Sequence, residues 1–263
     1  MSALAWRGVS VALGGRPVLC GVDLTLAEGE VLVLAGRNGA GKTTLLRLGT
    51  RLLSPDAASV ELGGRPLGAL SRRALAREIA LVPQETAVPF PFQVGEVALM
   101  GRAPHLGLLG FESPADVAAA RAALARVGIG ALADRSILEV SGGERQLAMV
   151  ARALTQDARI LLLDEPTAHL DLRRRLELLG MLRQLAAEGR SALVVSHDLA
   201  LSLRFADRIA LLDEGRILAV GPPAETLRPE LVRRAFGVEA EVLLAGDGAP
   251  VLVPRAPAEP GTA

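Results

Sequence analysis

The chain contains 263 residues with a mass of 27.4 kDa, which suits one large domain or two closely packed subdomains and excludes a multi-domain machine. Its 29 acidic side chains balance its 29 basic ones, so there is no net positive field for nucleic acid, and we expect no nucleic-acid partner. Cys20 is the only cysteine, which excludes an internal disulfide and a cysteine cluster for zinc or an iron–sulfur centre, and favours a reducing, cytoplasmic compartment.

Apolar residues make up 50% of the chain, and the mean hydropathy is +0.36. No uncharged apolar stretch approaches the ~18–20 residues needed to cross a bilayer. The N-terminal segment has no basic stretch ahead of its short apolar run, and Gly14, Gly15 and Pro17 indicate a turn, so we expect no signal peptide. The apolar surplus instead predicts strands buried on both faces and a surface that docks onto a partner.

The first informative element is a strand, Glu30–Gly36, followed by a match to GxxxxGK[ST] and a helix-like TTLLRL. In this motif backbone N–H groups surround phosphate oxygens, the lysine contacts the β and γ phosphates, and the hydroxyl of Thr43 binds Mg²⁺. Lys42 is the only lysine among 29 Lys and Arg residues, which indicates a position that a guanidinium cannot fill. The alternative is a glycine-rich turn that binds nothing. The candidate nucleotide contacts are Gly36, Arg37, Asn38, Gly39, Ala40, Gly41, Lys42, Thr43 and Thr44.

A helical pattern follows. One helix is expected at Val94–Met100, and an Ala-rich helix is expected to end at Val127. The second helix begins after Ser113, because Ser113 and Asp116 have the spacing of a capping box. We interpret this stretch as a helical subdomain inserted at residues 85–150.

A second candidate anion site begins at Ser141. Ser141 and Glu144 have capping-box spacing, and Gly142 and Gly143 permit a close backbone approach at the start of the helix QLAMVARAL. Exposed helix N-termini bind anions. The alternative is an ordinary capped helix without a ligand.

Two carboxylates end the strand expected at Arg159–Asp164. Four apolar residues precede Asp164 and Glu165, and successive side chains of a strand point to opposite faces. Asp164 is therefore the candidate Mg²⁺ ligand, and Glu165 is the candidate general base facing the attacking water. A buried strand followed by a solvated acidic turn is the alternative.

The remaining elements complete an α/β fold. Ser191–Ser196 is a third continuous apolar run with a helical stretch before it, so a mostly parallel sheet is the simplest interpretation. Ile209–Val220 predicts a terminal hairpin with its turn at Glu214 and Gly215. Four prolines from residue 241 onward predict a partly disordered tail at 241–263, after a short strand-like piece.

These motifs, in this order, resemble the ATP-binding cassette (ABC) ATPases over about residues 4–240. The matching pieces are the GxxxxGK[ST] loop, Gln84 in VPQ, the signature SGGER from Ser141, ILLLDEP around Asp164, the AHLD segment ending at Asp171, and His197 in VVSHD. The resemblance implies a P-loop NTPase (RecA-like) fold: a mostly parallel sheet core with an antiparallel β subdomain and the inserted helical subdomain. The cassette would occupy residues 1–240, with its core at 1–84 and 151–240.

The resemblance also implies ATP and Mg²⁺ as cofactors. Gln84 would sense Mg²⁺ and the attacking water, and His197 would bind the γ phosphate and orient that water, so both join Glu165 as catalytic candidates. A plain loop amide and a satisfied core histidine are the alternatives. Cassettes of this family pack head to tail, so the signature residues Ser141, Gly142 and Gly143 of one copy, with Asp171, would complete the nucleotide site of the other. Hydrolysis would then require closure of a homodimer.

One feature departs from the family pattern. The family stacks adenine on an aromatic residue shortly before the phosphate-binding loop, and this chain has no tyrosine. Leu13 or Val11 would then make an apolar contact with the base, with Trp6 as a weaker candidate for stacking. We expect weaker nucleotide affinity or base selectivity as a result.

The resemblance extends to one kind of ABC protein. The 57 residues from Gln84 to Ser141 are too few for a long coiled coil, and the insert is of transporter size. Without a membrane span, the chain would act at the cytoplasmic face of the inner membrane on a separate polytopic permease. Phe90–Phe111 resembles the ATPases that energise import of iron–siderophore complexes, haem or cobalamin, where a periplasmic or surface substrate-binding protein acts indirectly. Within this segment we interpret His105 as structural rather than as a metal or haem ligand.

Other functions stay open. An exporter ATPase, or an importer ATPase for another solute, would have the same biochemistry with a different partner. A soluble ABC ATPase would turn over without a membrane protein. A P-loop kinase would need an acceptor pocket and would lack the SGGE helix.

Overall fold

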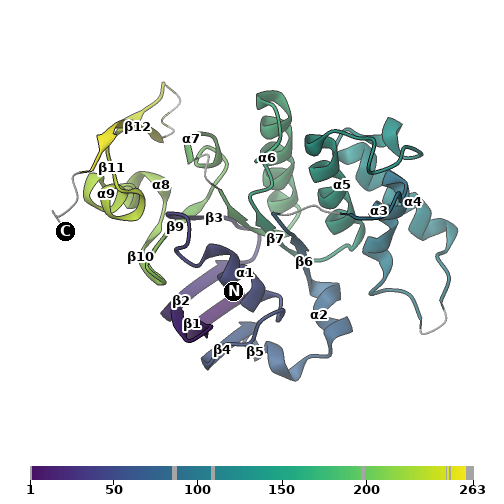
Figure 1. The fold of residues 1–263 in the computed structure, drawn as a ribbon, viewed down its shortest axis with the longest axis horizontal. Helices are drawn as coiled ribbons and strands as arrows, with labels where there is room; N and C mark the ends of the chain where they lie inside the picture. The colour runs from purple at the N-terminus through teal and green to yellow at the C-terminus, as the bar shows by residue number, and fades with distance from the viewer. Residues whose placement is uncertain are drawn as a thin grey trace.

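The computed structural model describes residues 2–84, 88–107, 110–196, 199–246, 248 and 250–258. Its centre is a six-stranded sheet in the order β10-β9-β3-β8-β7-β6, in which the strands from β9 to β6 run parallel (Figure 1). Every residue of β3, β7 and β8 is buried, as their continuous apolar runs predict, and β9 and β10 form the expected hairpin. The strands are Val31–Ala35 (β3), Ile79–Val82 (β6), Ile160–Asp164 (β7), Ser191–Val195 (β8), Arg208–Asp213 (β9) and Arg216–Gly221 (β10).

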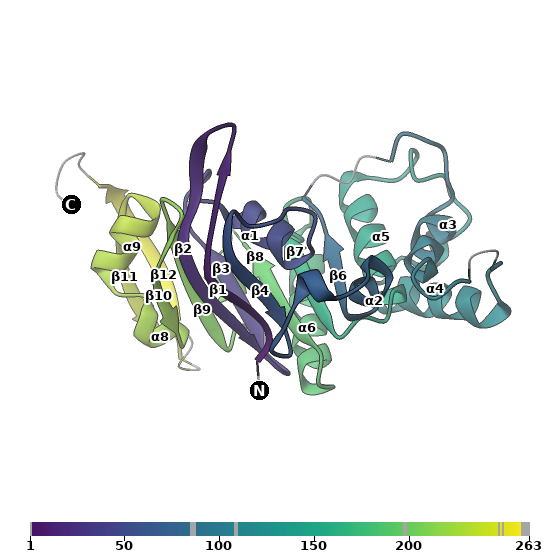
Figure 2. The same cartoon turned by 90° about the horizontal axis from the view of Figure 1, so that it is seen from below.

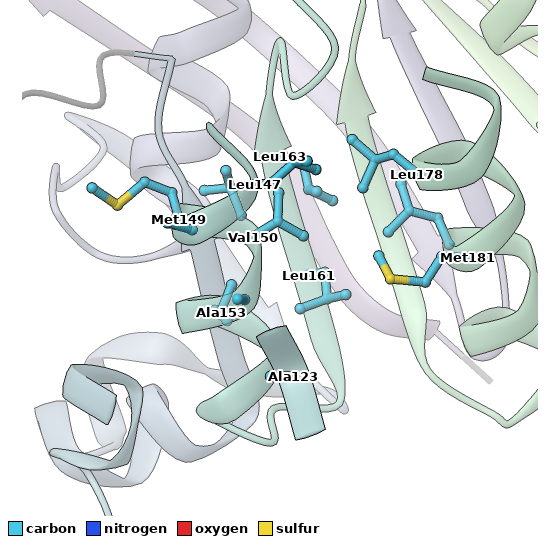
Figure 3. Packing of buried hydrophobic residues seen from close by; sticks show 14 of the residues in the cluster. Ala123, Leu147, Met149, Val150, Ala153, Leu161, Leu163, Leu178 and Met181 are labelled. Carbon is cyan, nitrogen blue, oxygen red and sulfur yellow. The ribbon is translucent and has the colours of Figure 1, made fainter. Parts of the chain in front are cut away.

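Both faces of this sheet are covered. On one face lie α5 (Gly142–Thr155) and α6 (Leu172–Ala187), and Figure 3 shows Leu161 and Leu163 of β7 between Val150 of α5 and the α6 residues Leu178 and Met181. On the other face lie α1 (Lys42–Gly49) and a second sheet. The parallel sheet is therefore the middle layer, and its buried strands hold the loops at their ends in fixed positions.

The second sheet is antiparallel, in the order β2-β1-β4-β5. Trp6 of β1 is fully buried between this sheet and α1, and its Nε1 donates a hydrogen bond of 3.1 Å to the carbonyl oxygen of Leu45. The proposal that Trp6 stacks on a base is therefore wrong, because the indole belongs to the core and its N–H is already paired. The strands are Ser2–Leu13 (β1), Arg16–Ala27 (β2), Ala57–Leu62 (β4) and Arg65–Pro66 (β5).

The helical region lies at one end of the molecule, beyond β6 (Figures 1 and 2). The capping boxes predicted at Ser113 and Ser141 are both present, and α5 runs without a break to Thr155. The boundary expected at residue 150 thus lies inside α5, because one helix serves both the helical region and the sheet. The other helices here are α3 (Val94–Leu99) and α4 (Pro114–Arg126), with single 3₁₀ turns at Met100–Arg102 and Gly130–Leu132. Helix α2 (Arg72–Glu78) and the 3₁₀ turn Leu67–Ala69 precede β6 and pack with the antiparallel sheet.

Asp116 connects the start of α4 to the turn before it. Its carboxylate accepts hydrogen bonds from the backbone and hydroxyl of Ser113 and, at 2.7 Å, from Nε of Arg102. The Ser113 bonds, reinforced by Arg102, lower the pKa of Asp116 from 3.8 to about 2.

This shift makes part of the stability pH-dependent. Because the folded-state pKa lies below the unfolded one, the contribution is complete above pH 3.8 and is lost as the pH falls through about 2. Asp116→Asn should therefore lower Tm at neutral pH, and the Tm difference from the wild type should narrow as the pH falls from about 4 toward about 2. Thermal melts of both proteins and of a control, Asp134→Asn at an exposed position, check this; a pH-independent difference would contradict it.

The C-terminal part packs against the end of the sheet formed by β9 and β10. Apolar residues of α7 (Leu199–Ser202) and α9 (Pro229–Phe236) form one cluster with β9, and α8 (Pro223–Thr226) precedes α9. The structure differs from the partly disordered tail expected from residue 241: β11 (Val238–Leu244) pairs antiparallel with β12 (Pro250–Pro257). Strand β12 tolerates Pro250 and Pro254 because they are four residues apart, so that their nitrogens lie on the same edge of the strand. In the described part of the chain, β12 pairs with β11 along its opposite edge, where no proline nitrogen is needed as a donor. No helix in the described ranges is both long and apolar enough to span a bilayer.

Candidate functional site

The loop between β3 and α1 is shaped by glycines. Gly36 has φ 153°, and a Cβ there would lie 2.0 Å from the carbonyl oxygen of Leu212 at the end of β9. Gly41 has φ 107° and precedes α1, where a Cβ would lie 2.6 Å from a methyl group of Leu19. Gly215 closes the loop from behind, since its N–H donates to the carbonyl oxygen of Ala40 at 3.2 Å. The loop thus needs glycine at these positions and presents the N-terminus of α1 to the space in front of it.

Lys42, the only lysine, is buried at the centre of this loop. Its Nζ donates to the carbonyl oxygens of Gly36 at 2.8 Å and Arg37 at 2.9 Å. Burial lowers the pKa of Lys42, and the nearby carboxylates of Glu165 and Asp164 act in the opposite direction. The ammonium is therefore held against the loop backbone, and its contact with phosphates stays a prediction.

A cavity of about 520 Å³ opens in front of the loop. Predicted site residues from three separate parts of the sequence line this cavity: those of the loop and the start of α1, Gln84 after β6, and Glu165 after β7. These elements meet because the carboxyl ends of parallel strands lie at one edge of the sheet. The residues that line the cavity are Val18, Asn38, Gly39, Gly41, Lys42, Thr43, Thr44, Gln84 and Glu165.

Asp164 lies at the end of β7 beside this cavity and is 3% exposed. Burial raises the pKa of Asp164, while a hydrogen bond from Thr43 and the charge of Lys42 lower it. Its Oδ1 is buried and has no hydrogen-bond partner within the part of the chain that the structure describes. A buried carboxylate oxygen without a partner, next to a hydroxyl, fits a hard divalent cation, so Asp164 and Thr43 are suited to hold Mg²⁺, with Gln84 on the same cavity wall. Bound Mg²⁺ would neutralise phosphate charge there.

Glu165 has a backbone conformation that is rare for a residue with a side chain. Its φ is 50°, in the left-handed region, and its N–H donates to the carbonyl oxygen of Val195 in β8 at 3.1 Å. This turn separates the two carboxylates: Asp164 is buried, and half-buried Glu165 lines the cavity. Such strain is commonly found at functional sites, and here it presents a proton acceptor to the space in front of Lys42.

The candidates around Ser141 line a different cavity, of about 540 Å³. Ser141 caps α5, and hydrogen bonds from its side chain and backbone lower the pKa of Glu144. Gly143 is closely packed, since a Cβ there would lie 2.7 Å from the carbonyl oxygen of His169. The lining residues are Ser141, Gly142, Gly143, Glu144, His169, Asp171 and Arg174.

The structure of one chain therefore places most of the predicted residues in two cavities that share no lining residue, and Gly36, Arg37, Ala40 and Asp164 line neither. Asp171 belongs to the Ser141 cavity, where its side chain caps α6 by accepting from the N–H of Arg174 at 2.8 Å. His197 lies outside the described residues. In the part of the chain that is described, no cluster of three His, Cys, Asp or Glu side chains could hold a metal.

Four lining residues were not among the predicted contacts: Val18, Glu144, His169 and Arg174. Val11 is buried and Leu13 is exposed, and neither lines the cavity of Lys42, whereas half-buried Val18 of β2 does. The expectation that Leu13 or Val11 contacts the base is therefore not supported, and Val18 is the apolar residue in position. The sequence offers a signal for Arg174, which is one helical turn beyond Asp171. In the structure its guanidinium pairs with Asp171 and, at 3.6 Å, with Glu144.

Comparison with known proteins fits this geometry. Residues 19–168 match the family model described as ABC transporter. The chain is 46% identical over 235 residues to the hemin import ATP-binding protein HmuV of Streptomyces coelicolor, covering 89% of this chain and 83% of that protein. It is 40% identical over 236 residues to the cobalamin import ATP-binding protein BtuD of Halobacterium salinarum, covering 89% of this chain and 59% of that protein.

Solved structures show the same relationship. The fold matches an inward-facing structure described as an ABC transporter of the metal-chelate type, with a TM-score of 0.83, 26% identity, and coverage of 97% of this chain and 98% of that one. An ATP-bound Atm1-family ABC exporter matches with a TM-score of 0.75 and 26% identity over 89% of this chain and 40% of that one. The predicted P-loop fold is thereby confirmed, and the chain belongs to the ABC transporter family as one of its ATP-binding ATPase subunits.

Proposed function

We propose that this chain hydrolyses ATP to power uptake of haem, as an iron chelate, through a separate membrane permease. The observation that carries the ATPase part is the single cavity that joins Lys42, Thr43, Gln84 and Glu165 beside the buried Asp164. The similarity to import ATP-binding proteins supports the direction of transport, and the relatives named for hemin, at 41–46% identity, favour haem over the cobalamin of the relatives at 40%.

Each side chain has a task in the hydrolysis. Lys42 and the loop N–H groups bind the phosphates, Thr43 and Asp164 would hold Mg²⁺, and Glu165 accepts a proton from the water that attacks the γ phosphorus. The bond from the γ phosphorus to the bridging oxygen breaks, and ADP and phosphate leave. His197 would bind the γ phosphate, and Gln84 would link the cavity to the helical region.

The separation of the two cavities supports a homodimer in which each nucleotide lies between the Lys42 cavity of one copy and the Ser141 cavity of the other. The permease would hold the two copies at the cytoplasmic face of the membrane. A substrate-binding protein would deliver the haem to the permease and would not contact this chain.

Ser141→Arg tests this shared site. The arginine fills the Ser141 cavity and removes the cap of α5, so ATP hydrolysis should fall by about 10²-fold or more, whereas binding of ATP to a single chain should stay within about twofold. Equilibrium binding of a fluorescent ATP analogue, measured beside steady-state hydrolysis, separates the two effects. Loss of binding in Ser141→Arg would contradict a site shared between copies.

The substrate is tested by transport. The chain and the permease that co-purifies with it are reconstituted in liposomes, and ATP-dependent uptake of hemin and of cobalamin is measured with wild type and with Glu165→Gln as the inactive control. Hemin uptake by the wild type alone is expected. Uptake of cobalamin alone would contradict haem as the substrate, and ATP-driven export would contradict the proposed direction. A rate of hydrolysis that does not depend on the permease would indicate a non-transport ATPase.

A further inference from the structure

One buried polar side chain has no part in the chemistry described above. Gln146 lies in α5, one turn beyond the capped start of the helix, and is 1% exposed. Its Nε2 and its Oε1 are both buried, and neither has a hydrogen-bond partner among the described residues. A buried amide that has lost its bonds to water destabilises the fold unless it finds partners, so a position that keeps a glutamine here needs an explanation.

Gln146 lies on the face of α5 that packs against β7 and the segment after it. Three residues earlier, Gly143 contacts the backbone at His169 so closely that a Cβ there would lie 2.7 Å from the carbonyl oxygen. Four residues later, Val150 packs near Leu161 and Leu163 of β7 (Figure 3). Because residues at this spacing share one helix face, Gln146 lies between these two contacts, where β7 ends and the segment begins.

The segment of residues 165–170 connects the two halves of the site. It begins at Glu165 and ends just before Asp171, which lines the Ser141 cavity. It consists of turns, with the N–H of Ala168 donating to the carbonyl oxygen of Glu165 at 3.2 Å and that of Leu170 to Thr167 at 3.2 Å. Isolated turns rearrange more easily than helices or strand ladders, so a shift of this segment would present new backbone groups to the amide of Gln146.

We propose that Gln146 is a positioning residue that latches the segment of residues 165–170 when two copies of the chain close over ATP. The amide, which has no partner in the arrangement described here, then bonds to the backbone of that segment and fixes Glu165 at the attacking water. This proposal rests on the two-copy closure proposed above. Because the latch acts only in the closed state, its loss affects turnover and closure but not the binding of ATP to a single chain.

Gln146→Leu tests the latch, since leucine removes the amide and keeps a similar side-chain volume. The nucleotide-free variant should have a Tm a few degrees above that of the wild type, because an unpaired buried amide is gone. Its kcat should fall by about tenfold or more, with KM for ATP within about twofold. In a Glu165→Gln background, half-maximal dimerisation in gel filtration should need about tenfold more ATP.

Gln146→Met, which is unbranched like glutamine, repeats the test if the leucine variant folds poorly. Met149→Leu is the matched control, a volume-conserving change at a buried position of the same helix, and it should leave kcat and closure unchanged. A lower Tm in both Gln146 variants, or a wild-type kcat in either, overturns the latch. If Glu165→Gln forms no ATP-dependent dimer, the two-copy closure itself fails and the latch with it; if that dimer forms and Gln146→Leu turns over normally, only the latch fails.

Discussion

Exchange of Glu165 for glutamine is expected to lower the rate of ATP hydrolysis by about 10²- to 10⁴-fold while ATP still binds. The amide keeps the size and the left-handed backbone position of Glu165 in the cavity wall but cannot accept a proton from water. With the chemical step blocked, the closed complex should accumulate. Gel filtration with and without ATP, beside a phosphate-release assay, should show a dimer that appears only with ATP.

The matched control is Glu177→Gln, which removes a carboxylate paired with Arg173 on the exposed side of α6. This variant should hydrolyse ATP at the wild-type rate and should form no trapped dimer. An unchanged rate of hydrolysis in Glu165→Gln would show that Glu165 is not the general base. A slow Glu165→Gln that stays monomeric with ATP would contradict the two-copy closure.

Replacement of Lys42 is expected to have the largest effect on binding. Lys42→Ala should weaken ATP affinity by about two orders of magnitude, since it removes a charged donor from the phosphate cavity. Lys42→Arg should weaken it similarly, because Lys42 is 6% exposed and its ammonium lies within 3 Å of the carbonyl oxygens of Gly36 and Arg37, which suits a compact ammonium better than a larger, planar guanidinium. Isothermal titration with ATP and Mg²⁺ measures both variants.

Arg65→Lys is the control for the exchange itself, because Arg65 is exposed and an arginine and a lysine should serve equally well there. Thermal melts check that the Lys42 variants remain folded. Wild-type affinity in Lys42→Arg would show that ATP binding does not require an ammonium at this position.

The parts of the fold that were predictable have local causes. Continuous apolar runs predict β3, β7 and β8, because a parallel strand covered on both faces has no polar side. The helix starts at Ser113 and Ser141 follow from side-chain spacing within one turn. The conformation of the GxxxxGK[ST] loop likewise follows from its own glycines. Its residues lie near Gln84 and Glu165 because parallel strands end at one edge of the sheet.

The parts that were missed depend on contacts between distant residues. Val18 reaches the cavity because β2 lies against the turn after β9, where the N–H of Cys20 donates to the carbonyl oxygen of Gly215 at 2.9 Å, and nothing near Val18 in the sequence indicates this. The strand at residues 250–257 was obscured by its prolines, whose effect depends on which edge of the strand is paired. The indole N–H of Trp6 donates to the carbonyl oxygen of a residue 39 positions away, so the sequence around Trp6 does not reveal that the ring belongs to the core.

The wall behind the phosphate loop is supplied by Leu212 and Gly215, which lie far downstream of Gly36 and Ala40. Strand β3 itself is flanked by β8 and β9, both of which are made much later. During synthesis the early segments thus emerge from the ribosome without the strands that hold them, and a nascent chain has no shaped phosphate loop until Gly215 has left the exit tunnel. Until then the apolar β3 is an exposed strand without neighbours, a state that invites aggregation and engages chaperones. The phosphate loop therefore takes its shape only after residues far downstream of it have been made.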